Sequence, residues 1–251
     1  MALMHVNFFS NVLGMCVNMD VIIPQSTTGQ IGLETTSSAT YPTLYLLHGM
    51  SDDHTIWQRR TSIERYAAYK GIAVVMPATN LGWYTDMECG YLKYFTFVSK
   101  ELPGICRDFF PKMSPKREDN WIAGLSMGGY GSVKAALWES DTFSKAVSLS
   151  GSFNVDKRPD TPYWNSIFGP PRDREAHTVE YAAEKLLSRG GKKPKFYLVC
   201  GTEDGLIDCN RNLKKFLTEK GFEVAYKESP GSHTWEYWDD EIQPALDWLT
   251  K

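Results

Sequence analysis

The residues most able to do chemistry lie in a Gly-Leu-Ser-Met-Gly segment at positions 124–128. This G-x-S-x-G pattern is typical of a sharp strand-to-helix turn that exposes a serine hydroxyl for nucleophilic attack. The flanking glycines let neighbouring backbone approach without a Cβ clash. A strand-like run at 121–123 precedes Ser126 and a helix-like run at 130–139 follows it, as such a turn requires. The alternative is a glycine-rich turn whose serine only caps the helix.

A serine nucleophile needs a general base, and the chain has five histidines. His233 follows the last strand-like run and a Pro-Gly-Ser turn, just before the C-terminal helix-like run. Loops at the carboxyl ends of parallel strands converge on one site, which favours His233 as the base over a surface helix cap. His48 also ends a strand, but it precedes Gly49 and suits an oxyanion turn better. The other three stand at the terminus, in a polar loop and in an irregular segment (His5, His54, His177).

The base needs an acid to orient it, and Gly-Thr-Glu-Asp-Gly at 201–205 follows another strand-like run. We select Asp204, with Glu203 and Asp208 as the nearby alternatives. Each could instead be a solvated charge at a helix N-terminus, where a carboxylate is favourable. The order Ser126, Asp204, His233 along the chain is that of an α/β-hydrolase and differs from the orders of other serine hydrolases.

The oxyanion of an acyl-transfer intermediate needs two backbone N–H donors. Met127 N–H, directly after the nucleophile, is one candidate. The other should come from the loop after the strand-like run at 44–47, where His48, Gly49 and Met50 follow. We expect Met50 N–H to be the second donor, because Gly49 can adopt the unusual dihedral that aims it inward.

Strands and helices must alternate to place these residues at one sheet edge. Strand-like runs occupy residues 6–9, 15–24, 41–47, 72–77, 121–124, 145–149, 195–201 and 223–228. Helix-like runs occupy residues 61–70, 91–109 (with a kink expected at Pro103), 128–139, 179–189, 207–220 and 234–249. This order predicts an α/β fold: a mostly parallel central sheet, antiparallel N-terminal edge strands and helices on both faces.

The length of 251 residues fits one domain, so we predict a single catalytic domain over 1–251. A proline-rich stretch at about 154–178 breaks the alternation and reads as a short cap-like insertion over one end of the sheet. The Ser/Thr-rich stretch at 26–40 reads as a long hairpin loop rather than a domain linker.

Composition excludes several classes of protein. Aromatic residues make up 13% of the chain, too many for a disordered protein. The net charge of −3 offers no footprint for nucleic acid or an anionic membrane. No apolar run approaches the roughly 20 residues of a membrane span, and no secretory signal is visible, so we expect a cytoplasmic protein. Five scattered cysteines suit reduced thiols. No motif for a metal or an organic cofactor is present, and we expect neither.

Several of these segments together resemble the esterase D-like branch of the α/β-hydrolases, over about residues 6–248. They are Tyr-Leu-Leu-His-Gly-Met at 45–50 with Trp57 shortly after, the serine motif at 124–129, Gly-Thr-Glu-Asp at 201–204, and Gly-Ser-His-Thr-Trp-Glu-Tyr-Trp at 231–238. Pro-Ala-Thr-Asn at 77–80 and Trp-Tyr-Thr-Asp at 83–86 make the compact bacterial tributyrin esterases the most similar group. The branch also includes S-formylglutathione hydrolases and feruloyl and acetyl-xylan esterases.

The resemblance implies a serine carboxylesterase acting on small esters with short acyl chains, with acylated sugars as further candidate substrates. It implies Ser126 as nucleophile, Asp204 as acid, His233 as base, and Met50 and Met127 as oxyanion donors. An S-formylglutathione thioesterase is the alternative, although Met50-Ser51 replaces the Leu-Thr-Cys-type continuation of those enzymes. A non-catalytic binding module on the same fold is the alternative from a different class. A homo-oligomer is compatible with the sequence.

Aromatic residues in the loops at the carboxyl ends of the strands are candidates for a small acyl pocket. Asp86 and Glu88, near the expected mouth, predict that anionic substrates are disfavoured. The pocket candidates are His48, Gly49, Trp57, Trp83, Phe153, Trp164 and Trp235.

Overall fold

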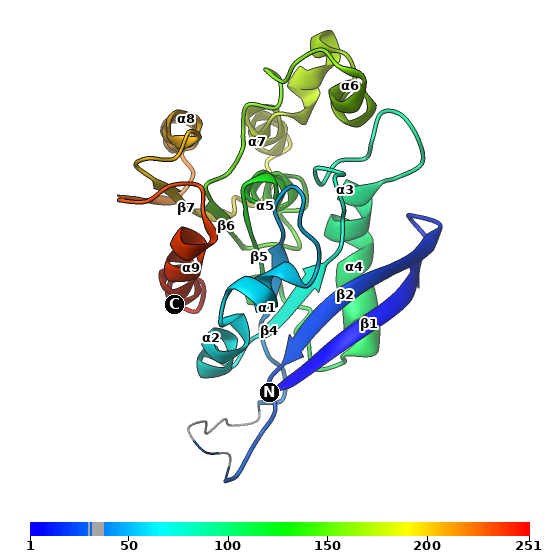
Figure 1. Ribbon diagram of the computed structural model, residues 1–251, viewed down its shortest axis with the longest axis vertical. Helices are drawn as coiled ribbons and strands as arrows, with labels where there is room; N and C mark the ends of the chain where they lie inside the picture. Colours follow the sequence, from blue (N-terminus) through cyan, green and yellow to red (C-terminus); the bar gives the residue numbers. More distant parts are fainter. Residues whose placement is uncertain (30, 32–37) are drawn as a thin grey trace.

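The computed structural model describes residues 1–29, 31 and 38–251, and its centre is an eight-stranded sheet (Figure 1). The strands run in the order β1-β2-β4-β3-β5-β6-β7-β8. β1 and β2 are antiparallel to each other, β2 is antiparallel to β4, and the remaining pairs are parallel. The predicted α/β-hydrolase sheet is therefore confirmed. Its strands are β1 (Ala2–Ser10), β2 (Met15–Ile23), β3 (Thr43–Leu47), β4 (Ala73–Pro77), β5 (Asn120–Leu125), β6 (Lys145–Leu149), β7 (Lys195–Gly201) and β8 (Val224–Ser229).

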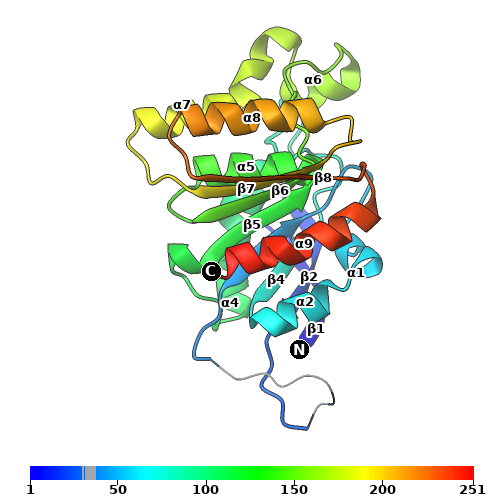
Figure 2. The ribbon, with the colours of Figure 1, turned by 90° about the vertical axis from the view of Figure 1, so that its left-hand side faces the viewer.

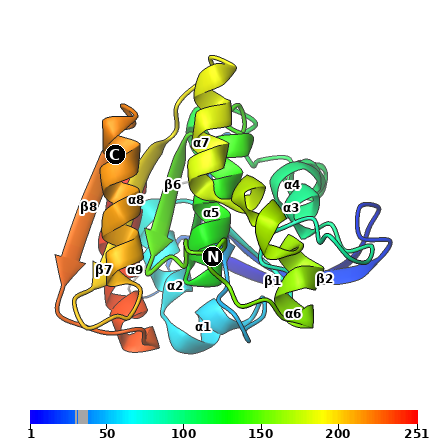
Figure 3. The same cartoon turned by 90° about the horizontal axis from the view of Figure 1, so that it is seen from above.

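Helices cover both faces of this sheet (Figure 2). One face carries α1 (Ile56–Arg60), α2 (Ile63–Lys70) and α9 (Trp235–Leu249). The other carries α3 (Tyr94–Thr96), α4 (Leu102–Phe109), α5 (Met127–Trp138), α7 (Val179–Ser188) and α8 (Ile207–Glu219). On that second face α7 packs beside both α5 and α8 (Figure 3).

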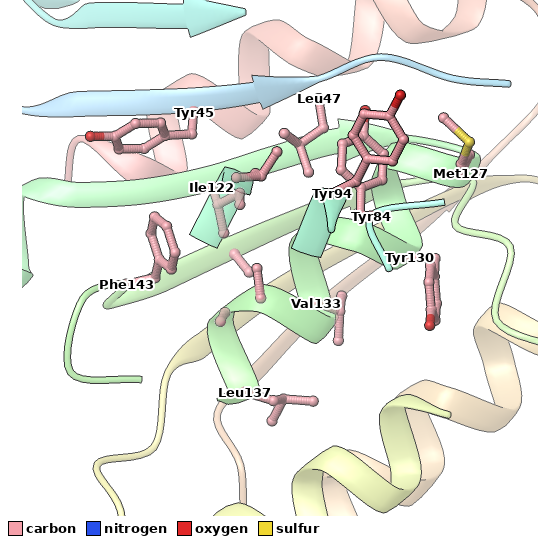
Figure 4. Packing of buried hydrophobic residues seen from close by; sticks show 14 of the residues in the cluster. Tyr45, Leu47, Tyr84, Tyr94, Ile122, Met127, Tyr130, Val133, Leu137 and Phe143 are labelled. Atoms are coloured by element: carbon pink, nitrogen blue, oxygen red, sulfur yellow. The ribbon is translucent and has the colours of Figure 1, made fainter. Parts of the chain in front are cut away.

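The central strands are buried on both sides, because successive side chains point to opposite faces. In β3, Tyr45 and Leu47 face the cluster under α5, whereas Leu44 and Leu46 face the cluster under α9. Figure 4 shows Tyr45 and Leu47 packed with side chains of β5 and α5. This two-sided burial explains why β3 reads as a continuous apolar run.

The expected helix at 91–109 is present over residues 94–109, but it is not α-helical throughout. Short α3 passes into a π-helical turn, Phe97–Glu101, and α4 follows it. Pro103 has no N–H to donate, and it lies directly after this turn, where the backbone ladder changes its spacing. The hydrogen bond that Pro103 cannot donate is therefore missing where the π-helical turn passes into α4.

The stretch at 154–178 contains α6 (Pro162–Phe168) and a 3-10 helix, Pro171–His177, and it lies over one end of the fold (Figure 1). Arg174 is fully buried and holds this segment together. Its guanidinium donates to the carbonyl oxygens of Arg158, Pro159 and Gly169 and to Asn165 Oδ1. The predicted hairpin loop at 26–40 falls partly on residues 30 and 32–37, which lie outside the described residues. No helix in the described ranges is long and apolar enough to cross a membrane.

Candidate active site

Ser126 lies at the turn between β5 and α5, with φ 52° and ψ −113°. A non-glycine residue at positive φ is strained, and the turn persists because the surrounding packing enforces it. A Cβ on Gly124 would lie 2.5 Å from the backbone of Gly128. A Cβ on Gly128 would lie 2.7 Å from the carbonyl oxygens of Leu47 and His48. The glycines of the motif therefore permit close packing of the turn against itself and against the end of β3.

Strained backbone recurs around this turn. Ser51, Trp83, Tyr84 and Ser150 also have positive φ, between 48° and 71°. They follow β3, β4 and β6, whose carboxyl ends meet at the same sheet edge as that of β5. Such conformations cost of order 1–3 kcal/mol each and gather at functional sites.

His233 connects the serine to a carboxylate. His233 Nε2 lies 3.0 Å from Ser126 Oγ, and His233 Nδ1 lies 2.8 Å from Asp204 Oδ2. An ionised carboxylate only accepts hydrogen bonds, so Nδ1 carries the proton and Nε2 is left as the acceptor for the serine hydroxyl. The structure thus brings together the three residues that the sequence selected from the ends of β5, β7 and β8.

Asp204 is buried but well supplied with donors. Its Oδ1 accepts a hydrogen bond of 2.8 Å from Leu206 N–H, in addition to the contact with His233. Burial alone would raise the pKa of Asp204, but these hydrogen bonds outweigh it and hold the pKa below its ordinary value. The ring of Trp238 packs edge-on against His233, with ring centres 4.8 Å apart. Asp204 therefore stays ionised, and the imidazole is held in one orientation.

The two alternative acids do not contact His233. Glu203 N–H donates to Gly231 O at 3.0 Å, and the Glu203 carboxylate accepts from Gly231 N–H. Asp208 has a side chain 87% exposed and pairs with Arg211. Glu203 therefore ties the loop after β7 to the loop that carries His233, while Asp208 is a solvated charge.

The two candidate oxyanion donors stand on either side of Ser126. Met127 is the first residue of α5, and its N–H adds to the partial positive charge of that helix N-terminus. Met50 lies in the loop after β3, against which Gly128 packs. Neither N–H donates a hydrogen bond to any other described residue.

The reason for a glycine at position 49 differs from the expected one. The positive φ in this loop is found at Ser51, whereas a Cβ on Gly49 would lie 2.5 Å from Leu125 Cδ1. Gly49 thus leaves room for the buried Leu125 side chain. His48 is fully buried, its Nε2 accepts from Thr79 N–H at 3.0 Å, and Tyr84 Oη donates to its carbonyl oxygen. Both contacts fix the loop that carries Met50.

A cavity of about 410 Å³ opens beside Ser126. Trp83 and Trp164 form apolar walls, and Arg158 contributes a cation that the sequence analysis did not identify. Only its place in the irregular insertion could have drawn attention to it. The lining residues are Met50, Trp83, Ser126, Ser152, Arg158, Trp164, Asp204, Gly205, Leu206 and His233.

Five of the residues predicted to form the acyl pocket do not line this cavity, and the prediction is corrected for them. They are His48, Gly49, Trp57, Phe153 and Trp235. Trp57 is fully buried, donates from Nε1 to Leu47 O and packs edge-on against Trp235 on the far side of β3. Phe153 is buried against Gly151. The sequence analysis proposed Trp57 and Phe153 as large aromatics near the site, but both are buried in the hydrophobic core.

The acidic residues expected at the mouth are also placed elsewhere. The Asp86 carboxylate accepts from Thr96 N–H and Thr96 Oγ1, and Glu88 lies 3.3 Å from His177 Nε2. Neither residue lines the cavity beside Ser126. In the described part of the chain, no three His, Cys, Asp or Glu side chains gather as a metal site would require.

A serine at a strained turn after a central parallel strand, with aspartate and histidine from the last two strands, defines an α/β-hydrolase. The family model described as "Putative esterase" matches residues 10–249. The chain belongs to this esterase family and is a carboxylic ester hydrolase, which also confirms the resemblance to the esterase D-like branch.

Three relatives illustrate the likeness. An acetyl esterase of Caldicellulosiruptor saccharolyticus is 30% identical over an alignment of 269 positions, gaps included. The alignment covers 100% of this chain and 99% of the relative. The substrate-bound structure of the fluorophosphonate-binding serine hydrolase FphF of Staphylococcus aureus is 33% identical with a TM-score of 0.87, covering 100% of this chain and 98% of the other. The S-formylglutathione hydrolase FrmB of the same organism is 32% identical with a TM-score of 0.86, covering 100% and 99%.

Proposed function

We propose that this enzyme hydrolyses short-chain acyl esters through an acyl-enzyme on Ser126. The contacts of 3.0 Å and 2.8 Å that link Ser126, His233 and Asp204 carry the proposal. His233 takes the serine proton as Oγ attacks the ester carbonyl, then returns it to the departing alcohol. Water, activated by the same imidazole, releases the acid. Asp204 orients the ring and stabilises its cation.

Met50 and Met127 N–H hold the oxyanion in this proposal. Both amides lack a partner among the described residues, as donors awaiting a substrate oxygen would. The two tryptophan walls of a 410 Å³ cavity suit a compact acyl or aryl group rather than a long chain. We further propose that residues 1–251 act as one catalytic domain and that residues 154–178 serve as its cap, since this segment supplies Arg158 and Trp164 to the cavity.

Labelling with a fluorophosphonate probe tests the nucleophile. The native protein should be labelled and Ser126→Ala should not, whereas equal labelling of both would exclude Ser126.

Asp204→Asn should remain folded and lose on the order of 10⁴-fold in kcat, because the imidazole then adopts the wrong tautomer. A loss below tenfold would rule out Asp204 as the orienting acid.

A thioesterase is the second candidate, favoured by the likeness to the S-formylglutathione hydrolase structure. Comparison of kcat/KM for 4-nitrophenyl acetate, butyrate and octanoate, S-formylglutathione and an acetylated xylo-oligosaccharide separates the candidates. We expect the short oxyesters to lead. A preference for the thioester by orders of magnitude would replace the proposed substrate class, and a lead for the oligosaccharide would identify acylated sugars.

A further inference from the structure

Arg158 places a cation in the cavity that also contains Ser126 and His233. Its guanidinium carbon lies 4.8 Å from the ring centre of Trp83 and 4.7 Å from that of Trp164. The charge thus lies against both indole rings, whose centres are 5.1 Å apart, and cation–π contact is a way to hold an arginine without a carboxylate. The cation is therefore held in place by the walls of the cavity itself.

This arginine has no acidic partner in the part of the chain that the structure describes. No carboxylate of the described residues lies within ion-pair distance of it, and its one side-chain acceptor is Ser152 Oγ, which also lines the cavity. The Nε atom is buried without a hydrogen-bond partner in the described chain. A guanidinium has five N–H donors, so most of its hydrogen-bonding capacity is unused. An unpaired, partly buried charge is costly unless it pairs with a ligand.

The backbone that carries Arg158 is firmly anchored. The fully buried Arg174 donates to Arg158 O and to Pro159 O, and also to Asn165 Oδ1 in the helix that carries Trp164. One buried side chain thus fixes both the loop of Arg158 and the helix of Trp164. Such preorganisation is expected of a recognition group rather than of a solvated surface arginine.

Among the described residues that line the cavity, the one acidic side chain is already engaged, since Asp204 binds His233 and Leu206 N–H. We propose that Arg158 is a specificity-determining residue and that the preferred esters carry a carboxylate, which its guanidinium binds while Ser126 attacks the ester bond. This inference rests on the proposed esterase function. A planar guanidinium recognises a carboxylate better than a lysine ammonium does, because it offers two parallel donors.

The test compares matched esters that differ in a carboxylate. On the alcohol side, 4-acetoxybenzoate is paired with 4-acetoxybenzamide; on the acyl side, the 4-nitrophenyl monoester of glutaric acid is paired with 4-nitrophenyl valerate. The readout is the ratio of kcat/KM within each pair for the native enzyme, Arg158→Gln and Arg158→Lys. Comparing ratios between proteins cancels both the intrinsic reactivity of each ester and any general loss of activity.

Arg172→Gln is the matched control, because Arg172 lies in the same insertion, has a side chain 83% exposed and does not line the cavity. In at least one pair, Arg158→Gln should lower the carboxylate-to-neutral ratio by about tenfold or more, chiefly through KM. Arg158→Lys should lower it less, and Arg172→Gln should leave it within about twofold. The pair that responds identifies which half of the substrate carries the anion. Ratios that Arg158→Gln leaves unchanged in both pairs would overturn the proposal.

Failure of the esterase function itself gives a different result, namely no turnover of any ester by the native protein. Binding then decides the inference: Ser126→Ala is titrated calorimetrically with 4-acetamidobenzoate and with 4-acetamidobenzamide. Tighter binding of the carboxylate, lost on adding Arg158→Gln, supports the carboxylate site. The 4-nitroanilides of glutaric acid (monoanilide) and of valeric acid are titrated in the same way for the acyl side, and equal binding within both pairs excludes the site.

Discussion

Glu203 and Gly231 bind each other twice across the loops that follow β7 and β8. Glu203 N–H donates to Gly231 O at 3.0 Å, and the Glu203 carboxylate accepts from Gly231 N–H. A Cβ on Gly201, the last residue of β7, would lie 2.1 Å from Gly231 O, so the backbone of the His233 loop packs directly against the end of β7. Asp204 and His233 follow directly in these loops. Their separation therefore depends on a contact made by neither of them.

Glu203→Ala should lower kcat with little change in KM, because the His233 loop loses one of its two ties. A small displacement of a catalytic group is costly, and we expect a loss on the order of tenfold. Glu203→Gln keeps an acceptor oxygen and should retain more of the activity. Asp208→Asn is the matched control, since it removes an exposed carboxylate from the same region. Equal kcat in Glu203→Ala and Asp208→Asn would show that the tie does not position His233.

Gly128→Ala should abolish most of the activity and lower stability. The alanine Cβ would lie 2.7 Å from the carbonyl oxygens of Leu47 and His48. These backbone atoms cannot move away by changing rotamer, as a side chain can. Overpacking of this kind costs about 1–3 kcal/mol, measured as the free energy of unfolding in urea. Gly104→Ala in α4 meets no atom within 4 Å and should instead gain about 0.5 kcal/mol. Native activity in Gly128→Ala would contradict the packing described at the turn.

Trp57 and Trp164 should respond differently to substitution. Trp57→Phe leaves Leu47 O without its donor and should cost about 1–3 kcal/mol of unfolding free energy, while relative rates on acetate, butyrate and octanoate esters stay the same. Trp164→Ala removes a cavity wall and should shift those relative rates toward longer acyl chains. A changed acyl preference in Trp57→Phe would show that Trp57 does contribute to the acyl pocket.

His48 should make stability depend on pH. Burial lowers its pKa from 6.5 to about 4, so the unfolded chain binds a proton at a higher pH than the native state. Stability is therefore lost as pH falls from about 6.5 to about 4, by up to about 3 kcal/mol from this group. The difference in unfolding free energy between native protein and His48→Gln should shrink over that range. A difference independent of pH would mean that His48 is not held neutral in the fold.

Local patterns in the sequence were sufficient to predict the serine turn and most strands of the sheet. The serine turn is legible because its glycines and its flanking strand and helix are adjacent in the chain. The sheet is legible because strands buried on both faces must be continuously apolar, as β3 is. The helix predicted at 91–109 is present over 94–109, but its π-helical turn was missed, because such a turn has no periodicity that distinguishes it from an ordinary kink at Pro103.

The sequence by itself determined which residue types end which strands, and so it selected Ser126, Asp204 and His233 from the order of the elements. Tertiary structure alone decided which side chains reach the cavity. Trp57 and Trp164 are both large aromatics in short helices, α1 and α6, yet Trp57 is fully buried in the core and Trp164 forms a wall of the cavity. The direction of a side chain depends on the packing of segments far apart in the chain, and no local pattern encodes it. Arg158 is in the cavity for the same reason, since its guanidinium packs on Trp83, which comes from the distant segment after β4, as well as on the nearby Trp164.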